Sequence, residues 1–257
     1  MADRVRPEEP FFVGYLPAPE SARRRMWRTA LVFIVALGGL AALVAASTGP
    51  FDRSLFEFDQ VREYRGTLEA HPVPAVSIVD PGARSPFGVR RLLLVAPGKH
   101  GAATIAEAFD GAQVTLRGKR IARDGREMIE VVEGSIARAS VPGVPVPAAS
   151  IDDLGTWTLS GEIVDGKCFL GVMNPGRLEV HRACAIRCIS GGIPPLLYAR
   201  DSSGREAEVV LVSSTGAPVN REVLDLVARP VSITGRLERR DDLYYLYADP
   251  REYRRLD

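Results

Sequence analysis

Cysteine, histidine and tryptophan are scarce in this sequence, and neither sign of charge dominates it. The 257 residues include three cysteines, three histidines and two tryptophans, and the formal net charge is +1. A chain so close to neutral has no general electrostatic attraction to nucleic acid, so we expect no nucleic-acid partner. The few histidines, and the lack of a spaced pair of acidic residues, leave little material for general acid–base catalysis. The sequence therefore predicts a protein that is not an enzyme.

Long hydrophobic runs are also missing, with one exception near the N-terminus. Residues 29–46 (TALVFIVALGGLAALVAA) carry no charge, and about 18 apolar residues at ~1.5 Å each just cross a hydrocarbon layer of ~30 Å. Arginines and a tryptophan crowd the N-terminal side of this run. By the positive-inside rule, they leave the N-terminus in the cytoplasm. We therefore expect a cytoplasmic tail (1–25), a single transmembrane helix in the lipid bilayer (26–47) and extracytoplasmic domains after it.

The alternative to a retained anchor is a cleaved signal peptide, because VAAS at 44–47 resembles a small-residue cleavage site. The polar segment before the apolar run is long for a signal peptide, so we favour the anchor. The tail sequence RPEEPFFVGYLPAPESA is rich in proline and acidic residues. Its Phe11, Phe12 and Tyr15 are too few to build a core, and they are either solvated or form a docking segment.

Two stretches of the remaining chain echo one another. Residues 109–133 and 227–249 each contain an alternating strand, a glycine, a basic segment, a turn and a second strand, which is the pattern of a β-hairpin. Each is preceded by a short helical segment (101–109 and 220–228). Each half also opens on a strand with a central glycine (62–70 and 156–165), and further strands are expected at 90–96, at 194–201 and directly after the latter.

A strand with a central glycine, further strands, a helix and a closing hairpin describe a small OB-type barrel, here present twice. The glycine permits the sharp bend that a tight barrel needs. The predicted fold is therefore mainly β, with one N-terminal transmembrane helix followed by two tandem OB-like barrels. The expected domains are 52–139 and 156–257, joined by a proline-rich linker (140–155). Two β-sandwiches are the alternative.

The three cysteines form the one unusual pattern in the second half. Cys168 ends VDGKC, and the spacing of His181, Cys184 and Cys188 places them on one face if HRACAIRC is helical. We favour a disulfide between Cys168 and one of the other cysteines, which would stabilise the domain by about 2–4 kcal/mol, and no cofactor. Zinc, another soft metal or haem bound by these four residues remains open. So does thiol chemistry at a cysteine activated by nearby arginines.

The segment that follows these cysteines predicts how the helix ends. Gly191 and Gly192 can close a helix C-terminus, and the two prolines after Ile193 prevent its continuation. We expect this helix to cover one opening of the second barrel. The first half has no such insert. We therefore expect the insert of the second half to serve as a docking surface, which includes Arg182 and Ile193.

The motifs G-x-I-x-D-x-x-C (161–168), C-x-x-x-C (184–188) and G-x-P (192–194) support a resemblance. Over about residues 157–250 the chain resembles small bacterial extracytoplasmic OB-like domains related to the nucleic-acid-binding anticodon fold. The resemblance implies fold and location, here the bacterial inner (cytoplasmic) membrane with periplasmic domains, and no activity. In architecture alone the chain is also similar to the membrane-tethered haem chaperone of cytochrome c maturation.

The functional expectation combines the anchor, the duplicated binding fold and the missing catalytic set. It is a membrane-anchored accessory or scaffold subunit that docks on a membrane protein complex of electron-transfer type. One alternative is a metal or haem carrier that uses the Cys/His cluster. The other is a thiol–disulfide protein.

Overall fold

The computed structural model describes Gly14 and residues 18–47, 54–83, 85, 88–139, 150–200, 203 and 205–256. The chain divides into two units, residues 1–51 and residues 52–257. The docking candidates Phe11, Phe12 and Tyr15 lie outside the described residues, as does most of the expected linker.

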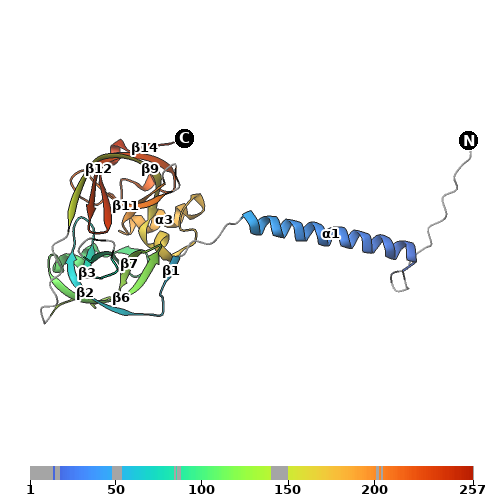
Figure 1. The fold of residues 1–257 in the computed structure, drawn as a ribbon, viewed down its shortest axis with the longest axis horizontal. Helices are drawn as coiled ribbons and strands as arrows, with labels where there is room; N and C mark the ends of the chain where they lie inside the picture. Colours follow the sequence, from blue (N-terminus) through green and yellow to red (C-terminus); the bar gives the residue numbers. More distant parts are fainter. Residues whose placement is uncertain are drawn as a thin grey trace, which may run out of the picture. The chain divides into compact units, whose positions relative to one another are not determined.

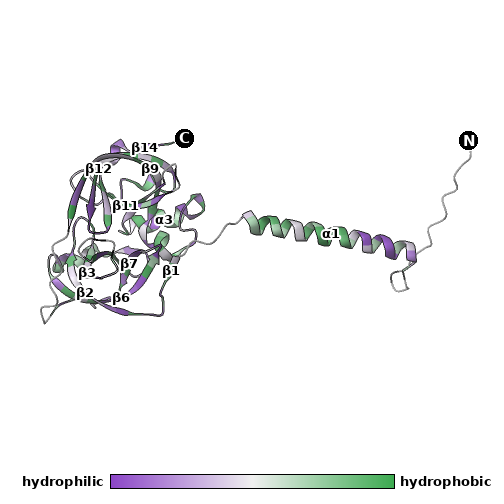
Figure 2. Ribbon diagram, viewed as in Figure 1, coloured by the Kyte–Doolittle hydropathy of each residue, from purple (hydrophilic) through white to green (hydrophobic). Residues whose placement is uncertain are grey.

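The first unit contains a single described helix, α1 (Glu20–Ser47), none of whose residues is buried (Figure 1). Within the described residues it is the one helix long and apolar enough to cross a membrane. Figure 2 shows hydrophobic residues along most of its length and hydrophilic ones toward its N-terminal end. The predicted apolar helix is confirmed, and it starts at Glu20 rather than at residue 26 because the arginine-rich segment is helical as well.

The second unit begins with a closed barrel of five strands in the order β2-β3-β4-β7-β6, in which β6 pairs with β2 again. Only β4 and β7 are parallel neighbours. The strands are β2 (Arg62–Glu69), β3 (Ala75–Val79), β4 (Val89–Ala96), β6 (Gln113–Arg123) and β7 (Arg126–Val131). The accessory elements are β1 (Ser54–Phe56), β5 (His100–Gly101), α2 (Ala103–Ala106), the 3-10 helix η1 (Glu107–Phe109) and β8 (Ala137–Arg138).

The second barrel repeats this order as β9-β10-β11-β13-β12, with β11 and β13 parallel and β12 paired with β9. Its strands are β9 (Ile151–Asp165), β10 (Pro195–Arg200), β11 (Glu206–Val212), β12 (Pro230–Arg240) and β13 (Leu243–Tyr247). The elements between β9 and β10 are the π-helix η2 (Cys168–Val172), the 3-10 helix η3 (Glu179–His181) and α3 (Arg182–Ser190). The remaining elements are η4 (Leu224–Leu226), η5 (Pro250–Glu252) and β14 (Arg254–Arg255). The prediction of a mainly β chain with two tandem OB-like barrels is confirmed.

Matching glycines explain why both halves bend in the same way. A Cβ added to Gly66 in β2 would meet the carbonyl oxygen of Ser77, and one added to Gly161 in β9 would meet that of Tyr198. The adjacent strand therefore passes too close to the first strand of each barrel for any side chain at the central position. The close approach comes from the curvature of a small closed barrel, as expected from the sequence.

Three details of the predicted secondary structure are wrong. Strand β3 (Ala75–Val79) was not expected, since AVSIV is a short apolar run without alternation. Strand β9 begins at Ile151, inside the expected linker (140–155), because its first residues pair with the end of β12. The segment expected to be helical at 220–228 contains only the single turn η4.

The two barrels share a hydrophobic core. Two separate domains joined by a stiff linker would each have a core of their own. One cluster of buried side chains draws on both barrels, for example Leu93 and Met128 from the first and Phe169 and Tyr245 from the second. Separate clusters fill the interior of each barrel. Fully burying one such side chain stabilises a fold by about 1.5–3 kcal/mol. The two barrels are therefore packed as one body, which Figure 1 shows as adjacent green and orange-red sheets.

A buried arginine links the two barrels in the region where they pack against each other, which we call the joint. The side chain of Arg91 in β4 is fully buried, and its guanidinium pairs with Glu69 of the same barrel at 2.5 Å. It also donates a hydrogen bond to the hydroxyl of Tyr245 in β13 at 3.2 Å. The backbone N–H of Arg91 donates to the Asp242 carboxylate of the second barrel at 2.9 Å. These partners satisfy a charge that would otherwise be costly to bury.

Candidate metal centre

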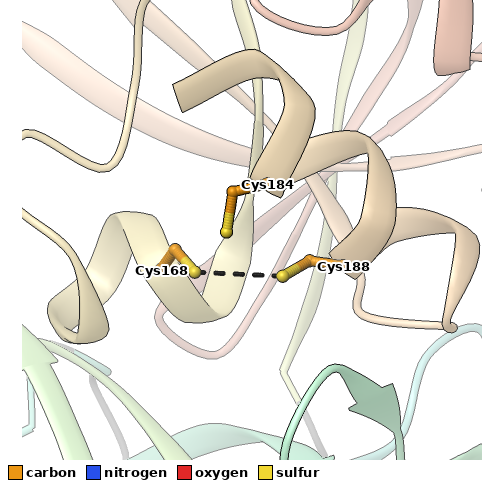
Figure 3. A group of neighbouring side chains, drawn as sticks. All are labelled: Cys168, Cys184 and Cys188. Atoms are coloured by element: carbon orange, nitrogen blue, oxygen red, sulfur yellow. Dashed lines mark hydrogen bonds between the residues drawn. The ribbon is translucent and has the colours of Figure 1, made fainter. Parts of the chain in front are cut away.

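The cysteines come together because two turns between β9 and β10 face each other. Cys168 is the first residue of η2, and Cys184 and Cys188 lie one turn apart on α3. The three sulfur atoms lie within 4.8 Å of one another, and those of Cys168 and Cys188 are 3.9 Å apart (Figure 3). Cys168 and Cys188 are buried, Cys184 is half-buried, and all three are free thiols. The predicted cluster is confirmed as a group of neighbours, without a disulfide bond.

Asp165, at the end of β9, holds both turns in place. One carboxylate oxygen accepts a hydrogen bond from the backbone N–H of Cys168 at 2.8 Å. The other lies 2.9 Å from Nε2 of His181, the residue before α3. Both Asp165 and His181 are buried. With Cys168 they form a second group whose ligand atoms lie within 4.8 Å of one another, but one imidazole nitrogen is already engaged by the carboxylate.

The C-terminus of α3 is closed as the sequence predicts. The N–H of Gly191 donates to the carbonyls of Arg187 and Cys188, and Gly192 follows with a φ of +98°. That left-handed backbone favours glycine. Strand β10 then begins at Pro195, so the predicted path of the chain from the helix to the strand is confirmed.

The predicted exposed docking surface is wrong at this end of the insert, because the first barrel covers it. The N–H of Gly101 in β5 donates to the carbonyl of Gly191 at 3.0 Å. A Cβ on Gly191 would meet the carbonyl oxygen of Lys99. The docking candidate Ile193 is fully buried, in the core that the barrels share. The other candidate, Arg182, is half-buried and donates to the carbonyl of Val227 at 3.1 Å.

Two lysines place positive charge beside the sulfurs. Lys99, in the turn before β5, has its ammonium 2.8 Å from the sulfur of Cys184 and 3.7 Å from that of Cys188. Lys167 is buried next to Cys168, and its ammonium pairs with Glu130 of the first barrel at 2.5 Å. It also donates to the carbonyls of two residues in the turn that contains Lys99, at 3.0 and 2.6 Å. The first barrel thus completes the surroundings of the cluster.

The cluster opens into a pocket of about 500 Å³ at the joint between the barrels. Its apolar wall comes from both barrels and consists of Phe56, Phe58, Val172 and Met173. Lys119 lies at the same pocket with its ammonium 4.1 Å from the centre of the Phe58 ring. The thiols therefore face a largely apolar cavity with cationic groups at its edge.

The pKa values of the two buried thiols, Cys168 and Cys188, are shifted in opposite directions. The hydrogen bond between the two sulfurs lowers the pKa of Cys188 to about 7, helped by the ammonium of Lys99 and opposed by burial. The same hydrogen bond, together with burial, raises the pKa of Cys168. The hydrogen bond to Cys184 raises the pKa of Lys99 in turn. Cys188 is thus the first of the pair to become a thiolate, the form that binds metals and attacks disulfides.

The sequence predicts the cysteines and His181 but not the charged residues around them, among them Asp165, Lys99 and Lys167. Asp165 carries a usable signal, since an acidic residue three positions before a cysteine can bond to that cysteine's N–H across a turn. Lys99 has none, because it lies 85 residues from Cys184 and in the other barrel. No family model, curated protein or solved structure matches this chain.

Proposed function

We propose that this protein is a membrane-anchored carrier of a soft metal ion, bound by the thiolates of Cys168, Cys184 and Cys188. The observation that supports the proposal is the convergence of three free sulfurs within 4.8 Å of one another. Soft thiolate ligands select ions such as Zn(II) and Cu(I). Two sulfurs at ~2.3 Å from a common ion would be about 3.8–4.0 Å apart, and the Cys168 and Cys188 sulfurs are 3.9 Å apart.

The surroundings suit a bound ion. Metal–thiolate sites depend on outer hydrogen bonds that orient the ligands. Here Asp165 fixes the turn that carries Cys168, and Lys99 places an ammonium against two sulfurs. That ammonium would offset the negative charge that several thiolates leave on a metal complex. The open pocket gives an ion a route in and out, whereas purely structural zinc sites are closed.

The location follows the expectation from the sequence. With α1 in the membrane and its arginine-rich end in the cytoplasm, the barrels lie outside the cytoplasm. A carrier held there delivers its ion to an acceptor in the same membrane, such as the electron-transfer complex expected from the sequence. Docking on that acceptor would use surfaces other than Ile193, which is buried.

A second candidate function is thiol–disulfide exchange, favoured by the close approach of Cys168 and Cys188. A disulfide needs its sulfurs about 2.05 Å apart, and the observed 3.9 Å would have to shorten. In an exchange, this pair would be oxidised to a disulfide while a partner's disulfide is reduced to two thiols. The two functions compete, because a disulfide would consume two of the three metal ligands.

Metal content and thiol count of the full chain, purified from its native membrane in mild detergent, test the proposal. We expect about one soft metal ion per chain, retained in the control H71A and lost in C168S, C184S and C188S. His71 is an exposed histidine outside the cluster. A metal-free protein with one disulfide would support the exchange function instead. A metal-free protein with three reduced thiols would contradict the carrier function, and if that protein also fails to reduce a model disulfide, the exchange function is contradicted as well.

A further inference from the structure

A methionine, Met173, lines the pocket into which the three thiols open. Met173 follows η2 directly, and its backbone N–H donates to the carbonyl of Cys168 at 3.0 Å. Its side chain lines the pocket with Cys168, Cys184 and Cys188, and it is 45% exposed. A methionine side chain has three rotatable bonds, so its thioether can turn toward the thiols that line the same pocket. We propose that the ion is Cu(I), a cargo held by the three thiolates with the thioether of Met173 as the ligand on the open side. This inference rests on the proposed function.

The backbone holds Met173 close to the cluster. Gly176, two residues after Asn174 in the loop that follows, has a φ of +65°. A Cβ there would meet the carbonyl oxygens of both Cys168 and Met173. The loop therefore folds back onto η2, so that Cys168 and Met173 move together. The sequence NPG directly after Met173 thus serves to fix a potential ligand.

The remaining donors near the cluster fit zinc poorly. Zinc in proteins takes four ligands from thiolate, imidazole and carboxylate. His181 and Asp165 are paired with each other at 2.9 Å and buried. Lys99 fills the space beside Cys184 with an ammonium, which has no lone pair to give a metal. The carboxylate of Glu130, which also lines the pocket, is paired with the ammonium of Lys167 at 2.5 Å. Thiolates and a thioether are left, and this soft set selects Cu(I).

The pocket walls suit an ion that is delivered and released. Phe56 and Phe58 of the first barrel form an apolar wall with Val172, next to the sulfurs. Such a wall keeps water from one side of the site, while the exposed thioether leaves the other side accessible to an acceptor's own ligands. Transfer by ligand exchange keeps the ion as Cu(I) throughout, so no electron is gained or lost. The thiolates return to thiols by taking up protons from water.

Titration with Cu(I) and with Zn(II) tests the inference. The full-length, fully reduced protein in mild detergent receives Cu(I) from a chromophoric competitor under anaerobic conditions, and Zn(II) in a parallel series. The variants are M173L, which removes the thioether and keeps the size of the side chain, and C184S. The control is M26L, because Met26 is an exposed methionine at the start of α1, outside the pocket.

We expect one Cu(I) per chain, with M173L weakening its binding by at least the roughly tenfold that loss of even an outer hydrogen-bond partner of a metal site costs. M26L should bind like the unaltered protein, and M173L should leave Zn(II) binding unchanged. If M173L binds Cu(I) as tightly as the unaltered protein while C184S does not, the thiol site stands and the copper inference is wrong. If Zn(II) binds and Cu(I) does not, the inference is equally wrong. If neither ion binds, the proposed function fails as well.

Discussion

The ammonium of Lys99 lies 2.8 Å from the sulfur of Cys184, although the two residues belong to different barrels. The same ammonium is 3.7 Å from the sulfur of Cys188. A cation at these distances stabilises the thiolate over the thiol. The chemistry of a cluster encoded in the second barrel therefore depends on a turn of the first.

Lys99→Ala should raise the pKa of Cys188. The pKa of this thiol is about 7, below the ordinary value of about 8.5, so thiolate accumulates as the pH rises through 7. Without the ammonium, the rise should occur at higher pH. The ultraviolet absorbance of thiolate, followed across a pH titration of the metal-free protein, measures this step.

Lys119→Ala is the matched control for that titration, because Lys119 lines the same pocket but lies over Phe58. Its profile should coincide with that of the unaltered protein, and Cys188→Ser should lack the early step. If Lys99→Ala also leaves the profile unchanged, the ammonium does not act on the thiols.

Gly191→Ala should destabilise the protein by about 1–3 kcal/mol, the usual cost of forcing an extra methyl group into a packed site. The added Cβ would meet the carbonyl oxygen of Lys99 across the joint. The free energy of unfolding in urea measures the effect. Gly82→Ala is the control, since among the described residues a Cβ added to Gly82 would meet only the side chain of Asp80. Equal stability of the two variants would mean that the contact at Gly191 is looser than described.

Arg91→Ala should cost about 3–5 kcal/mol, because it leaves the partners of a buried charge unpaired. Tyr245→Phe removes only the hydrogen bond between the Tyr245 hydroxyl and Arg91. We expect this variant to lower the free energy of unfolding by about 1 kcal/mol. Urea unfolding of both variants checks the order. A loss for Arg91→Ala no greater than that for Tyr245→Phe would contradict a structural role for the ion pair with Glu69.

The second barrel should not fold by itself. A fragment of residues 150–257 would expose the half of the shared core that contains Phe169 and Tyr245. We expect this fragment to bind a hydrophobic dye and to lack a sharp unfolding transition. A fragment of residues 52–257, with both barrels, should unfold cooperatively. Cooperative unfolding of the shorter, monomeric fragment would show that the shared core is dispensable.

The local features of the fold are those that the sequence could predict. The turn at Asp124 and Gly125, with φ of +47° and +80°, and the turn that begins at Asp241 both lie where turn residues interrupt alternating strands. The helix α3 and its glycine end were likewise readable from periodicity and capping. The second strand of the first barrel was not, because its short apolar run carries no period.

The joint between the barrels could not be predicted from the sequence. Its contacts connect residues far apart in the chain, such as Arg91 with Tyr245 and Lys99 with Cys184. No local pattern encodes which surfaces of two barrels will meet. The expectation of two separate domains followed from the proline-rich segment, which indicates a boundary but not how closely its neighbours pack. The prediction that Ile193 is a docking residue is wrong for the same reason. The sequence around an apolar residue in a loop does not show whether a partner protein or another part of the same chain buries it.

The contact between Gly101 and Gly191 also makes the sequences of the two barrels depend on each other. Neither glycine can be replaced by a residue with a side chain, because the backbone of the other barrel occupies the space that a Cβ would need. The two barrels are therefore not interchangeable at this contact, and a change in the backbone of one loop requires a matching change in the other. The two barrels thus form a complementary pair, in which the second supplies the thiols and the first supplies the cation and part of the apolar wall beside them.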